Sequence, residues 1–441
     1  MQNHPQPSRR TFLKQLAGAA IAAPFITSRL LAAPPSRRLR HASFGAAGMA
    51  WADLTQIANC QNVDIVAVCD VDLTHMADAK KQFPNARFYQ DWRELLDKEA
   101  KNIDSVNVSV PDHMHAPIGL SAMQLGKNVY GQKPLAHEIA EVRHMTELAK
   151  KQGVVTQMGI QIHSDFYYRL GVRLVQDGVI GKIKEVHSWC NKSWGDLTDR
   201  PDRTDPVPEG FDWNLWLGVC KERPFIGDQY YHPGNWRKRL DFGTGTFGDM
   251  GCHIFDPVFE SIGLTAPISV RSEGTAPNQW NWSLNGLVLF TFAGNERTAE
   301  KTLPVTWYDG TSKPPATAIA MIEGEEFPAG AGSLFIGTEG VMLLPHAGDR
   351  PSLYPKAKYA DFKLPHVKGL KHWEQFVEAC RGNDRTLADF SYAGPLTEAI
   401  LLGGIASRFP HTTLHWNSRK LKFHQSEANR FVRRDYRPGW A

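Results

Sequence analysis

The sequence predicts two fold classes in one chain. An α/β domain with a doubly wound parallel sheet comes first, and an α+β domain built on a large, mainly antiparallel open sheet follows. In residues 36–158, short apolar runs alternate with helical stretches, which is typical of parallel strands joined by helices. In residues 159–441, long strand-like runs follow one another without intervening helices, which favours antiparallel pairing. A chain of 441 residues is long enough for both domains and their cores.

The first 33 residues predict an export signal rather than a part of the fold. The stretch 8–14, with the pair Arg9 and Arg10, fits the twin-arginine pattern, and a weakly apolar run from Leu16 to Ala23 follows it. That run is too short and too rich in alanine for a membrane span. We therefore expect cleavage near Ala32 or Ala33, a periplasmic location, and no stable membrane insertion after processing.

Residues 36–158 contain six candidate strands. The expected strands are Arg40–Phe44, Val63–Cys69, Arg87–Tyr89, Ser105–Val110, Asn128–Tyr130 and Val154–Met158, with a helix over Trp51–Ala58 after the first.

A turn of small residues, Gly45 to Ala50, joins the first strand to its helix. Such a turn brings backbone amides and the helix N-terminus to a pyrophosphate. Ala47 and Ala50 stand where the strict Gly-x-Gly-x-x-Gly pattern has glycine. Asp70 ends the next strand, 25 residues beyond Gly45. Its carboxylate suits a ribose 2′-hydroxyl, with capping of the next helix as the alternative. These features predict a Rossmann domain that binds NAD.

A lysine is expected at the carboxyl end of the fifth strand. The chain leaves that strand as Gly131-Gln132-Lys133-Pro134. Pro134 cannot donate to a sheet and restricts Lys133 to an extended conformation. Open α/β sheets bind their ligands at this edge. The alternative is an ordinary surface lysine.

Residues 159–441 carry the elements of the second domain. The expected strands are Ile183–Trp189, Ile268–Glu273, Leu287–Phe292 and Glu300–Trp307, and the expected helices are Phe166–Gln176, Asp249–Ile262, Leu370–Cys380 and Leu396–Ser407. The stretch Asp309–Gly332 is rich in Gly and Pro and predicts a long loop.

Asp249 and His253 form the second candidate for chemistry. They are four residues apart, so on a helix they share a face. The alternatives are a solvated pair or a metal site, but no third ligand stands at a fitting spacing. The six cysteines form no CxxC pair and no zinc spacing. We therefore expect no metal.

Together, Lys133-Pro134 after the fifth strand and the stretch Asp249 to His253 resemble the Gfo/Idh/MocA oxidoreductase family. The resemblance covers nearly the whole mature chain, and Gln132 stands where the family usually has glutamate. The supporting pieces are Pro111-Asp112-His113 with His115, Gly126-Lys127-Asn128-Val129, Trp236-Arg237 and Gly243-Thr244-Gly245. The resemblance implies an NAD(P)-dependent sugar or polyol dehydrogenase, or an NAD-dependent glycosidase of the same fold.

The resemblance also implies roles for individual residues. Lys133 would stabilise a developing alkoxide or pass a proton, His253 would be the general base, and Asp249 would orient the substrate or the imidazole. The residues expected at the cofactor are Gly45, Ala46, Ala47, Gly48, Met49, Asp70, Pro111, His113, His115, Gln132 and Lys133. Those expected at the substrate are His163, Trp194, Trp236 and Arg237, whereas Trp213 and Trp216 are expected to anchor a loop.

The predicted function is an exported NAD(H)-dependent oxidoreductase that acts on a sugar, a polyol or a derivative by hydride transfer. One alternative is a glycosidase that oxidises its sugar transiently. Another is a non-catalytic carbohydrate- or nucleotide-binding protein, favoured by Ala47, Ala50 and Gln132. The net charge of +4 is small and the basic residues are dispersed, which gives no nucleic-acid signature. Family precedent implies a homo-oligomer built through the open sheet.

Overall fold

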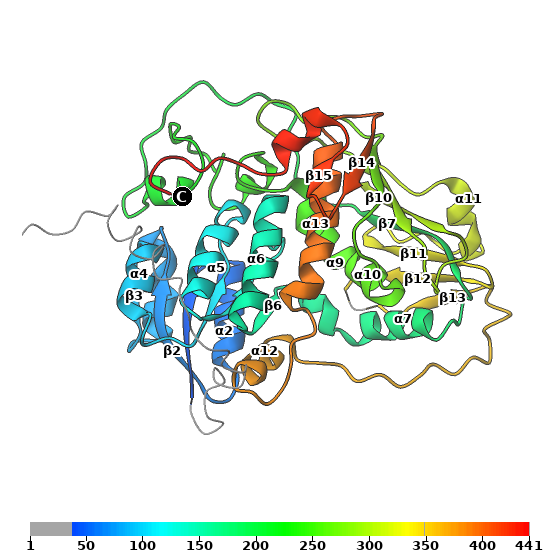
Figure 1. The fold of residues 1–441 in the computed structure, drawn as a ribbon, viewed down its shortest axis with the longest axis horizontal. Coiled ribbons are helices and arrows are strands. Elements are labelled where there is room, and N and C mark those ends of the chain that lie inside the picture. Colours follow the sequence, from blue (N-terminus) through cyan, green and yellow to red (C-terminus); the bar gives the residue numbers. More distant parts are fainter. Residues whose placement is uncertain (1–37, 348, 441) are drawn as a thin grey trace, which may run out of the picture. The chain divides into compact units, whose positions relative to one another are not determined.

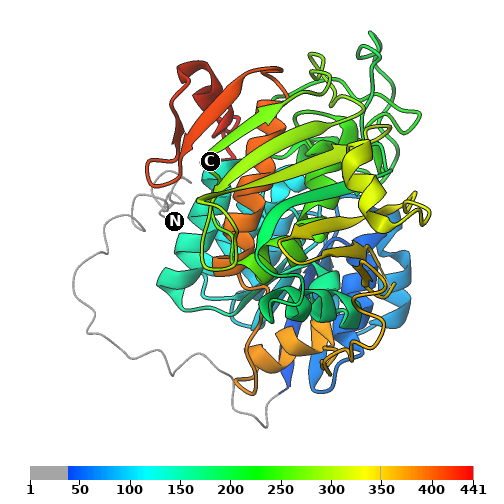
Figure 2. The ribbon, with the colours of Figure 1, turned by 90° about the vertical axis from the view of Figure 1, so that its right-hand side faces the viewer.

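The computed structural model describes residues 38–347 and 349–440, so the predicted export signal lies outside it. Its described part contains a six-stranded and a nine-stranded sheet, as Figures 1 and 2 show. The two predicted fold classes are thus confirmed. None of the helices in this part has the length and apolar character that a bilayer crossing requires.

The six-stranded sheet is parallel throughout, in the order β3-β2-β1-β4-β5-β6. Its strands are β1 (Leu39–Phe44), β2 (Val63–Cys69), β3 (Arg87–Tyr89), β4 (Ser105–Val108), β5 (Asn128–Gly131) and β6 (Thr156–Met158). Phe44 at the end of β1 pairs with Cys69 on β2 and with Val108 on β4, so these three strands end level. The strand order reverses between β1 and β4, which is where open α/β sheets bind ligands.

Helices connect the strands of this sheet. They are α2 (Met49–Ala58), α3 (Ala77–Gln82), α4 (Trp92–Glu99), α5 (His115–Gln124) and α6 (Ile139–Gln152), with short 3₁₀ turns η1 (Leu73–Met76) and η2 (Asp112–Met114). Helix α6 begins with a capping box in which Glu138 and Glu141 satisfy each other's backbone amides.

The nine-stranded sheet has the order β13-β12-β11-β7-β10-β9-β8-β14-β15. Its strands are β7 (Ile183–Cys190), β8 (Ser269–Ser272), β9 (Leu287–Ala293), β10 (Thr302–Asp309), β11 (Ala331–Gly337), β12 (Val341–Pro345), β13 (Ser352–Tyr354), β14 (Thr413–Asn417) and β15 (Lys422–Phe423). All neighbouring strands are antiparallel except β7 and β10. On β9, Val288, Phe290 and Phe292 are buried while Leu289 is exposed, which is the period of a sheet with one covered face.

Helices cover that face. They are α7 (Phe166–Gln176), α9 (Gly245–Ile254), α10 (Asp256–Ile262) and α13 (Phe390–Ala406), with α8 (Trp213–Leu217), α11 (Ala316–Ile319), α12 (His372–Cys380), η3 (Gln161–Ser164), η4 (Asn235–Lys238), η5 (Ala320–Ile322) and η6 (Ser426–Phe431) elsewhere. Helix α13 packs on α6, α9 and β8, and Figure 1 shows it between the two sheets. Thirteen of its 17 residues are buried, and its one acidic residue, Glu398, pairs with Arg143 of α6.

Three predicted elements differ most from the structure, and five strands of the nine-stranded sheet, β11 to β15, were not predicted. The helix predicted over Asp249–Ile262 is two helices, because Pro257 has no N–H to continue the hydrogen-bond ladder of α9. The helix predicted from Leu396 begins at Phe390, where Asp389 accepts hydrogen bonds from the amides of Ser391 and Tyr392. The predicted loop Asp309–Gly332 contains α11 and η5.

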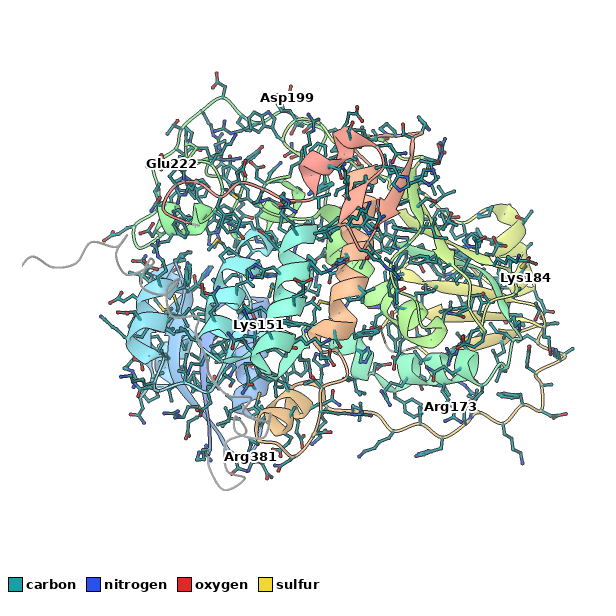
Figure 3. The ribbon with its side chains drawn as sticks, in the orientation of Figure 1. Lys151, Arg173, Lys184, Asp199, Glu222 and Arg381 are labelled. Carbon is teal, nitrogen blue, oxygen red and sulfur yellow. The ribbon has the colours of Figure 1, made fainter. Side chains whose placement is uncertain are left out.

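The charged side chains lie mainly on the outside of this part. Figure 3 shows Lys151 on α6, Arg173 on α7 and Lys184 on β7, all of which are exposed. The groups of interest for function are instead those few charged side chains that lie inside.

Candidate active site

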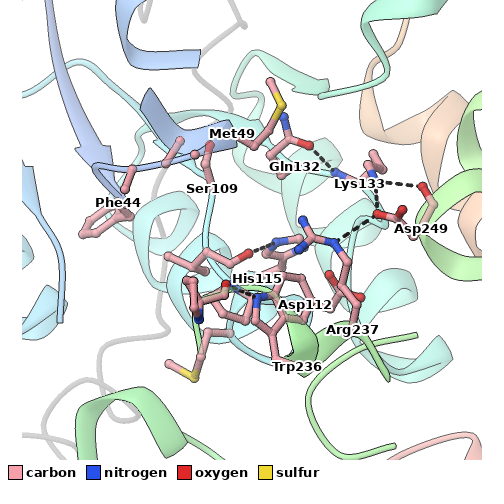
Figure 4. A pocket seen from close by; sticks show the side chains of 18 of the residues that line it. Phe44, Met49, Ser109, Asp112, His115, Gln132, Lys133, Trp236, Arg237 and Asp249 are labelled. Carbon is pink, nitrogen blue, oxygen red and sulfur yellow. Dashed lines mark hydrogen bonds and ion pairs between the residues drawn. The ribbon is translucent and has the colours of Figure 1, made fainter. Parts of the chain in front are cut away.

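A cavity of about 590 Å³ lies at the carboxyl ends of the parallel strands. Loops after β1, β2, β4 and β5 line one side, and residues of η4, α9 and the segment after β7 line the other (Figure 4). The sequence predicted a ligand site at this edge from the strand pattern, and the cavity occupies that place.

The turn after β1 is shaped by glycine at two positions. At Gly45, with φ +100°, an added Cβ would lie 2.5 Å from the Ser109 carbonyl oxygen and 2.6 Å from the Ala50 Cβ. Only glycine fits there. Gly48, with φ +57°, has open space around it and forms the N-cap of α2. Ala47, Gly48 and Met49 line the cavity, so backbone at a helix N-terminus faces the space where an anion would bind.

Asp70 also lines the cavity, and its carboxylate is fixed by two backbone amides. One oxygen accepts from the N–H of Ala46 at 2.9 Å, and the other from the N–H of Asp72 at 2.9 Å. The acid therefore ties the glycine turn to the end of β2. It does not cap the next 3₁₀ helix, because Asp72 does so by accepting from the amide of Thr74.

Gln132 is held by a buried acid on α2. Its side-chain N–H donates to Asp53 Oδ2 at 2.8 Å, and its Oε1 accepts from the N–H of Lys133. Asp53 is fully buried, and it also accepts from Ser109 Oγ and from Trp373 Nε1. Burial raises the pKa of Asp53, although these donors lower it. Asp53 of α2 thus places a carboxylate within hydrogen-bond distance of the neutral amide of Gln132.

Lys133 contacts Asp249 through two hydrogen bonds. Its Nζ donates to Asp249 Oδ1 at 2.6 Å and to the Asp249 backbone oxygen at 2.7 Å (Figure 4). Asp249 also accepts from Trp194 Nε1 at 2.8 Å and from Arg237 Nε at 3.3 Å. Burial disfavours the charged form of Asp249, but the charges of Lys133 and Arg237 outweigh it and lower its pKa well below its usual range. Lys133 and Asp249, predicted separately, form one ion pair.

Two tryptophans flank the guanidinium of Arg237 near this pair. Its carbon lies 4.3 Å from the ring centroid of Trp236 and 5.4 Å from that of Trp194. All three side chains line the cavity. They form an aromatic and cationic wall next to Lys133.

His253 lies one turn after Asp249 on α9 and lines the cavity. Its Nδ1 is buried and has no hydrogen-bond partner among the described residues. Burial, together with the positive charge of Lys133, lowers the pKa of His253 well below 6.5. The neutral form of the imidazole therefore predominates at neutral pH.

Two residues predicted at the cofactor, Ala46 and His113, lie outside the cavity lining, and a third, His115, lines it with both ring nitrogens already occupied. Ala46 is buried and donates its N–H to Asp70, so it supports the turn without lining the cavity. His113 is fully buried against Trp216 and Phe242, and its Nε2 contacts the Trp216 carbonyl. His115 lines the cavity, but both its ring nitrogens contact backbone carbonyls, so it shapes the site.

His163, predicted at the substrate, also lies outside the lining. It is buried behind the site, where Nδ1 contacts Asp256 Oδ1 at 2.9 Å and the ring packs on Tyr392. The 3₁₀ turn after β6 brings the neighbouring Gln161 to the cavity instead. Pro111, by contrast, lines the cavity as predicted.

The lining includes polar residues that the sequence did not predict. Lys192 follows β7, Gln161 lies in η3, and His346 follows β12, and all three line the same cavity as His253. His346 Nδ1 lies 2.7 Å from the hydroxyl oxygen of Tyr168, and burial lowers the pKa of His346 to about 4. None of these three stands in a motif, so only the folded arrangement of β7, η3 and β12 identifies them.

The comparisons agree with this arrangement. Residues 39–160 match the description "Oxidoreductase family, NAD-binding Rossmann fold", and residues 175–288 match "Oxidoreductase family, C-terminal alpha/beta domain", both of the Gfo/Idh/MocA family. The WlbA dehydrogenase of Bordetella pertussis, solved with NADH and UDP-GlcNAcA, has a TM-score of 0.61 and 16% identity, covering 86% of this chain and 99% of that one. At this identity the likeness is one of fold.

Curated relatives match over shorter stretches. Levoglucosan dehydrogenase of Pseudarthrobacter phenanthrenivorans is 23% identical over 220 residues, which is 50% of this chain and 48% of the relative. Glycosyl hydrolase family 109 protein 1 of a Shewanella species is 25% identical over 165 residues, which is 35% of each. The chain thus matches about half of the first relative and about a third of the second.

The two family matches together span more than half of the chain; the first covers the six-stranded sheet, and the second covers part of the domain that follows it. The chain therefore belongs to the Gfo/Idh/MocA oxidoreductases, and its N-terminal domain is the NAD-binding Rossmann domain of that family.

Proposed function

We propose that this protein is an NAD(H)-dependent oxidoreductase that transfers hydride to or from a carbon of a sugar, a polyol or a sugar derivative. The observation that carries the proposal is the position of Lys133. An ammonium has three N–H donors, and Asp249 accepts two of them. The third remains for an oxygen in the cavity that Lys133 lines.

Lys133 and Asp249 would act on the charge of the substrate oxygen. Because the pKa of Asp249 is lowered, this acid is ionised at neutral pH and keeps a cation beside it. A fixed cation stabilises the alkoxide that develops when a hydroxyl is oxidised. NAD, when bound, accepts or supplies the hydride.

His253 would take the hydroxyl proton. Its lowered pKa means that the neutral, proton-accepting form predominates at neutral pH. It stands on the same helix as Asp249, one turn on, so α9 presents the anchor of Lys133 and the proton acceptor to one cavity.

The substrate class is argued from the wall beside Lys133. Trp194 and Trp236 offer apolar faces, while Arg237 and Lys192 offer donors in the same cavity. Sugars and polyols have apolar C–H faces and polar rims, which match such a wall. The dehydrogenase relative named for levoglucosan supports the same class.

Activity assays on aldoses, polyols and aryl glycosides test the proposal. With the substrate that emerges, Lys133→Ala and His253→Ala should keep bound NAD and lose at least about 100-fold in rate, the scale of a general acid–base group. The matched controls are Lys151→Ala and His366→Ala, two residues outside the cavity lining. Full activity in both site variants would show that the assigned residues are wrong.

A glycosidase that oxidises its sugar transiently is the second candidate, supported by the glycosyl hydrolase relative. It would release a free sugar with no net NADH and would exchange the proton next to the transient ketone with solvent deuterium. A dehydrogenase forms NADH in step with an oxidised product. An enzyme that recycles NAD with a second sugar forms one oxidised and one reduced product.

We also propose that the protein is exported to the periplasm by the twin-arginine route. The support is the pattern of residues 8–14 and the weakly apolar run that follows. That pathway carries folded proteins, so a cofactor would be loaded before export.

A further inference from the structure

Three potential metal ligands meet at the edge of the cofactor cavity. Asp72 caps η1 after β2, His75 lies within η1, and His232 comes from the segment between α8 and η4. One ligand atom from each lies within 4.8 Å of the other two. His232 is 160 residues from Asp72, so no spacing in the sequence predicts this cluster.

Two of the three distances between these atoms fit a tetrahedral ion, and the third, between the two imidazole nitrogens, is at most 4.8 Å. Zinc binds nitrogen and oxygen at about 2.0–2.2 Å, which places neighbouring ligand atoms about 3.3–3.6 Å apart. Asp72 Oδ2 lies 3.2 Å from His232 Nε2 and 3.7 Å from His75 Nε2. Both values are within a few tenths of an ångström of that edge.

The side chains are also oriented as ligands are. Asp72 Oδ1 accepts the N–H and the hydroxyl of Thr74, which leaves Oδ2 facing the two imidazoles. His75 turns Nε2 toward Asp72 and Nδ1 toward Asp70 Oδ2, 3.6 Å away. Asp70 thus lies on the side of His75 where a carboxylate usually supports a metal-bound histidine, and its oxygen is just outside hydrogen-bond range.

An ordinary hydrogen-bonded cluster explains this arrangement less well. Two imidazole nitrogens face one carboxylate oxygen, and the rings lie 5.0 Å apart between centroids. The longer of the two contacts, 3.7 Å to His75 Nε2, is outside hydrogen-bond range. A single divalent ion satisfies all three ligand atoms at once.

We propose that Asp72, His75 and His232 bind one zinc ion, which ties the segment carrying His232 to the Rossmann domain at the edge of the cofactor cavity. Two nitrogens and one oxygen suit zinc, whereas Mg²⁺ and Ca²⁺ prefer oxygen ligands. The side chains of Asp72, His75 and His232 are 13%, 24% and 19% exposed, which leaves room for water as the fourth ligand. The site shares no residue with Lys133, Asp249 and His253 and does not depend on the reaction proposed for them.

Zinc titration of the mature protein, stripped of metal by a chelator, tests the site. Calorimetry and native mass spectrometry should show one zinc ion per chain. His232→Ala should weaken zinc binding by at least about 100-fold, because it removes a direct ligand. Asp72→Asn should weaken it as well while its Oδ1 still accepts from Thr74, so this variant keeps the local fold. His366→Ala is the matched control.

Wild-type protein that takes up no zinc would overturn the proposal. So would a His232→Ala or Asp72→Asn variant that binds zinc as tightly as the control. Hydrogen exchange tests the bridging role separately: zinc should slow exchange in residues 228–236 of the wild type and leave it unchanged in His232→Ala. If zinc does not slow exchange in the wild type, the proposed link between the His232 segment and the Rossmann domain is wrong.

Discussion

Replacing Gln132 with Glu, the residue usual in the family, should destabilise this protein. Gln132 donates an N–H to Asp53 Oδ2 at 2.8 Å, and Asp53 is fully buried. A glutamate would place a second carboxylate against the first with no donor between them. Two carboxylates at such a distance do not both ionise, so one must hold a proton.

The cost of that proton gives the magnitude. A glutamate with the reference pKa of about 4.3 is ionised at pH 7 in the unfolded chain. Keeping it protonated in the folded chain costs about 1.36 kcal/mol for each pH unit above 4.3, which is about 3.7 kcal/mol at pH 7 and about 1 kcal/mol at pH 5. The folded variant binds one more proton than its unfolded chain does, so the pKa of the protonated carboxyl is raised by folding. Its deficit against wild type therefore grows as pH rises.

Urea unfolding at pH 5 and pH 7 measures this deficit in Gln132→Glu against wild type. The double variant Asp53→Asn with Gln132→Glu is the matched control, because it exchanges the donor and the acceptor. The new amide at position 53 would give its N–H to the new carboxylate at position 132, while its oxygen keeps the Trp373 N–H. We expect the double variant to recover most of the loss at pH 7.

Equal losses at pH 5 and pH 7 would refute the reasoning, because a shared proton must make the deficit depend on pH. A double variant no more stable than Gln132→Glu alone would refute it as well, since the loss would then not arise from the meeting of two carboxylates.

Three further predictions concern the cellular location, the preference between NAD(H) and NADP(H), and the pH dependence of kcat/KM. Replacing Arg9 and Arg10 with Lys should leave precursor in the cytoplasm, and cell fractionation that finds the variant in the periplasm would contradict the export proposal. Calorimetry should show NAD(H) bound more tightly than NADP(H), because a 2′-phosphate would meet the charge of Asp70, and Asp70→Asn should narrow that preference by about tenfold. Because the pKa of His253 is lowered, kcat/KM should stay level as pH falls from about 7.5 to about 6. A loss of kcat/KM centred near pH 6.5 would argue against a neutral His253 with a lowered pKa as the base.

The strands of the parallel sheet could be predicted, because most are short apolar runs between helices, whereas five strands of the second sheet, β11 to β15, were not predicted. The predicted Val63–Cys69 and Arg87–Tyr89 agree with the structure in both bounds. Helix ends were harder, because a single cap decides them. Asp389 caps α13, which begins six residues before the first residue predicted, and the helix tolerates Pro395 inside it.

Some site residues belong to sequence motifs, whereas others reach the cavity only through the fold. Lys133 and Asp249 belong to motifs, so the sequence pointed to each, but their ion pair joins positions 116 residues apart and needs the fold. Lys192 and His346 reach the cavity from strand ends of the second sheet, where one residue carries no pattern. His113 follows β4 in the Pro111-Asp112-His113 motif, but its side chain packs on Trp216 and does not line the cavity.

The fold also bears on whether the cofactor site is degraded. A Cβ added at Gly45 would lie 2.6 Å from the Cβ of Ala50. The position in the turn that requires glycine is therefore Gly45, and this chain has glycine there. Ala47 stands on the open, cavity-facing side, next to Gly48 with its positive φ. Each alanine therefore stands where a methyl group is accommodated.

Gln132 completes the argument against a vestigial site. The carboxylate that its position lacks is supplied by Asp53 from α2, within hydrogen-bond distance of Gln132 and joined to Ser109 and Trp373. An unpaired buried carboxylate is costly, and these donors keep Asp53 satisfied beside the cavity lining. The pair Asp53 and Gln132 is a built support beneath Lys133, whose N–H contacts Gln132 directly. The three departures that favoured a non-catalytic binding protein are thus compatible with a working cofactor and hydride-transfer site.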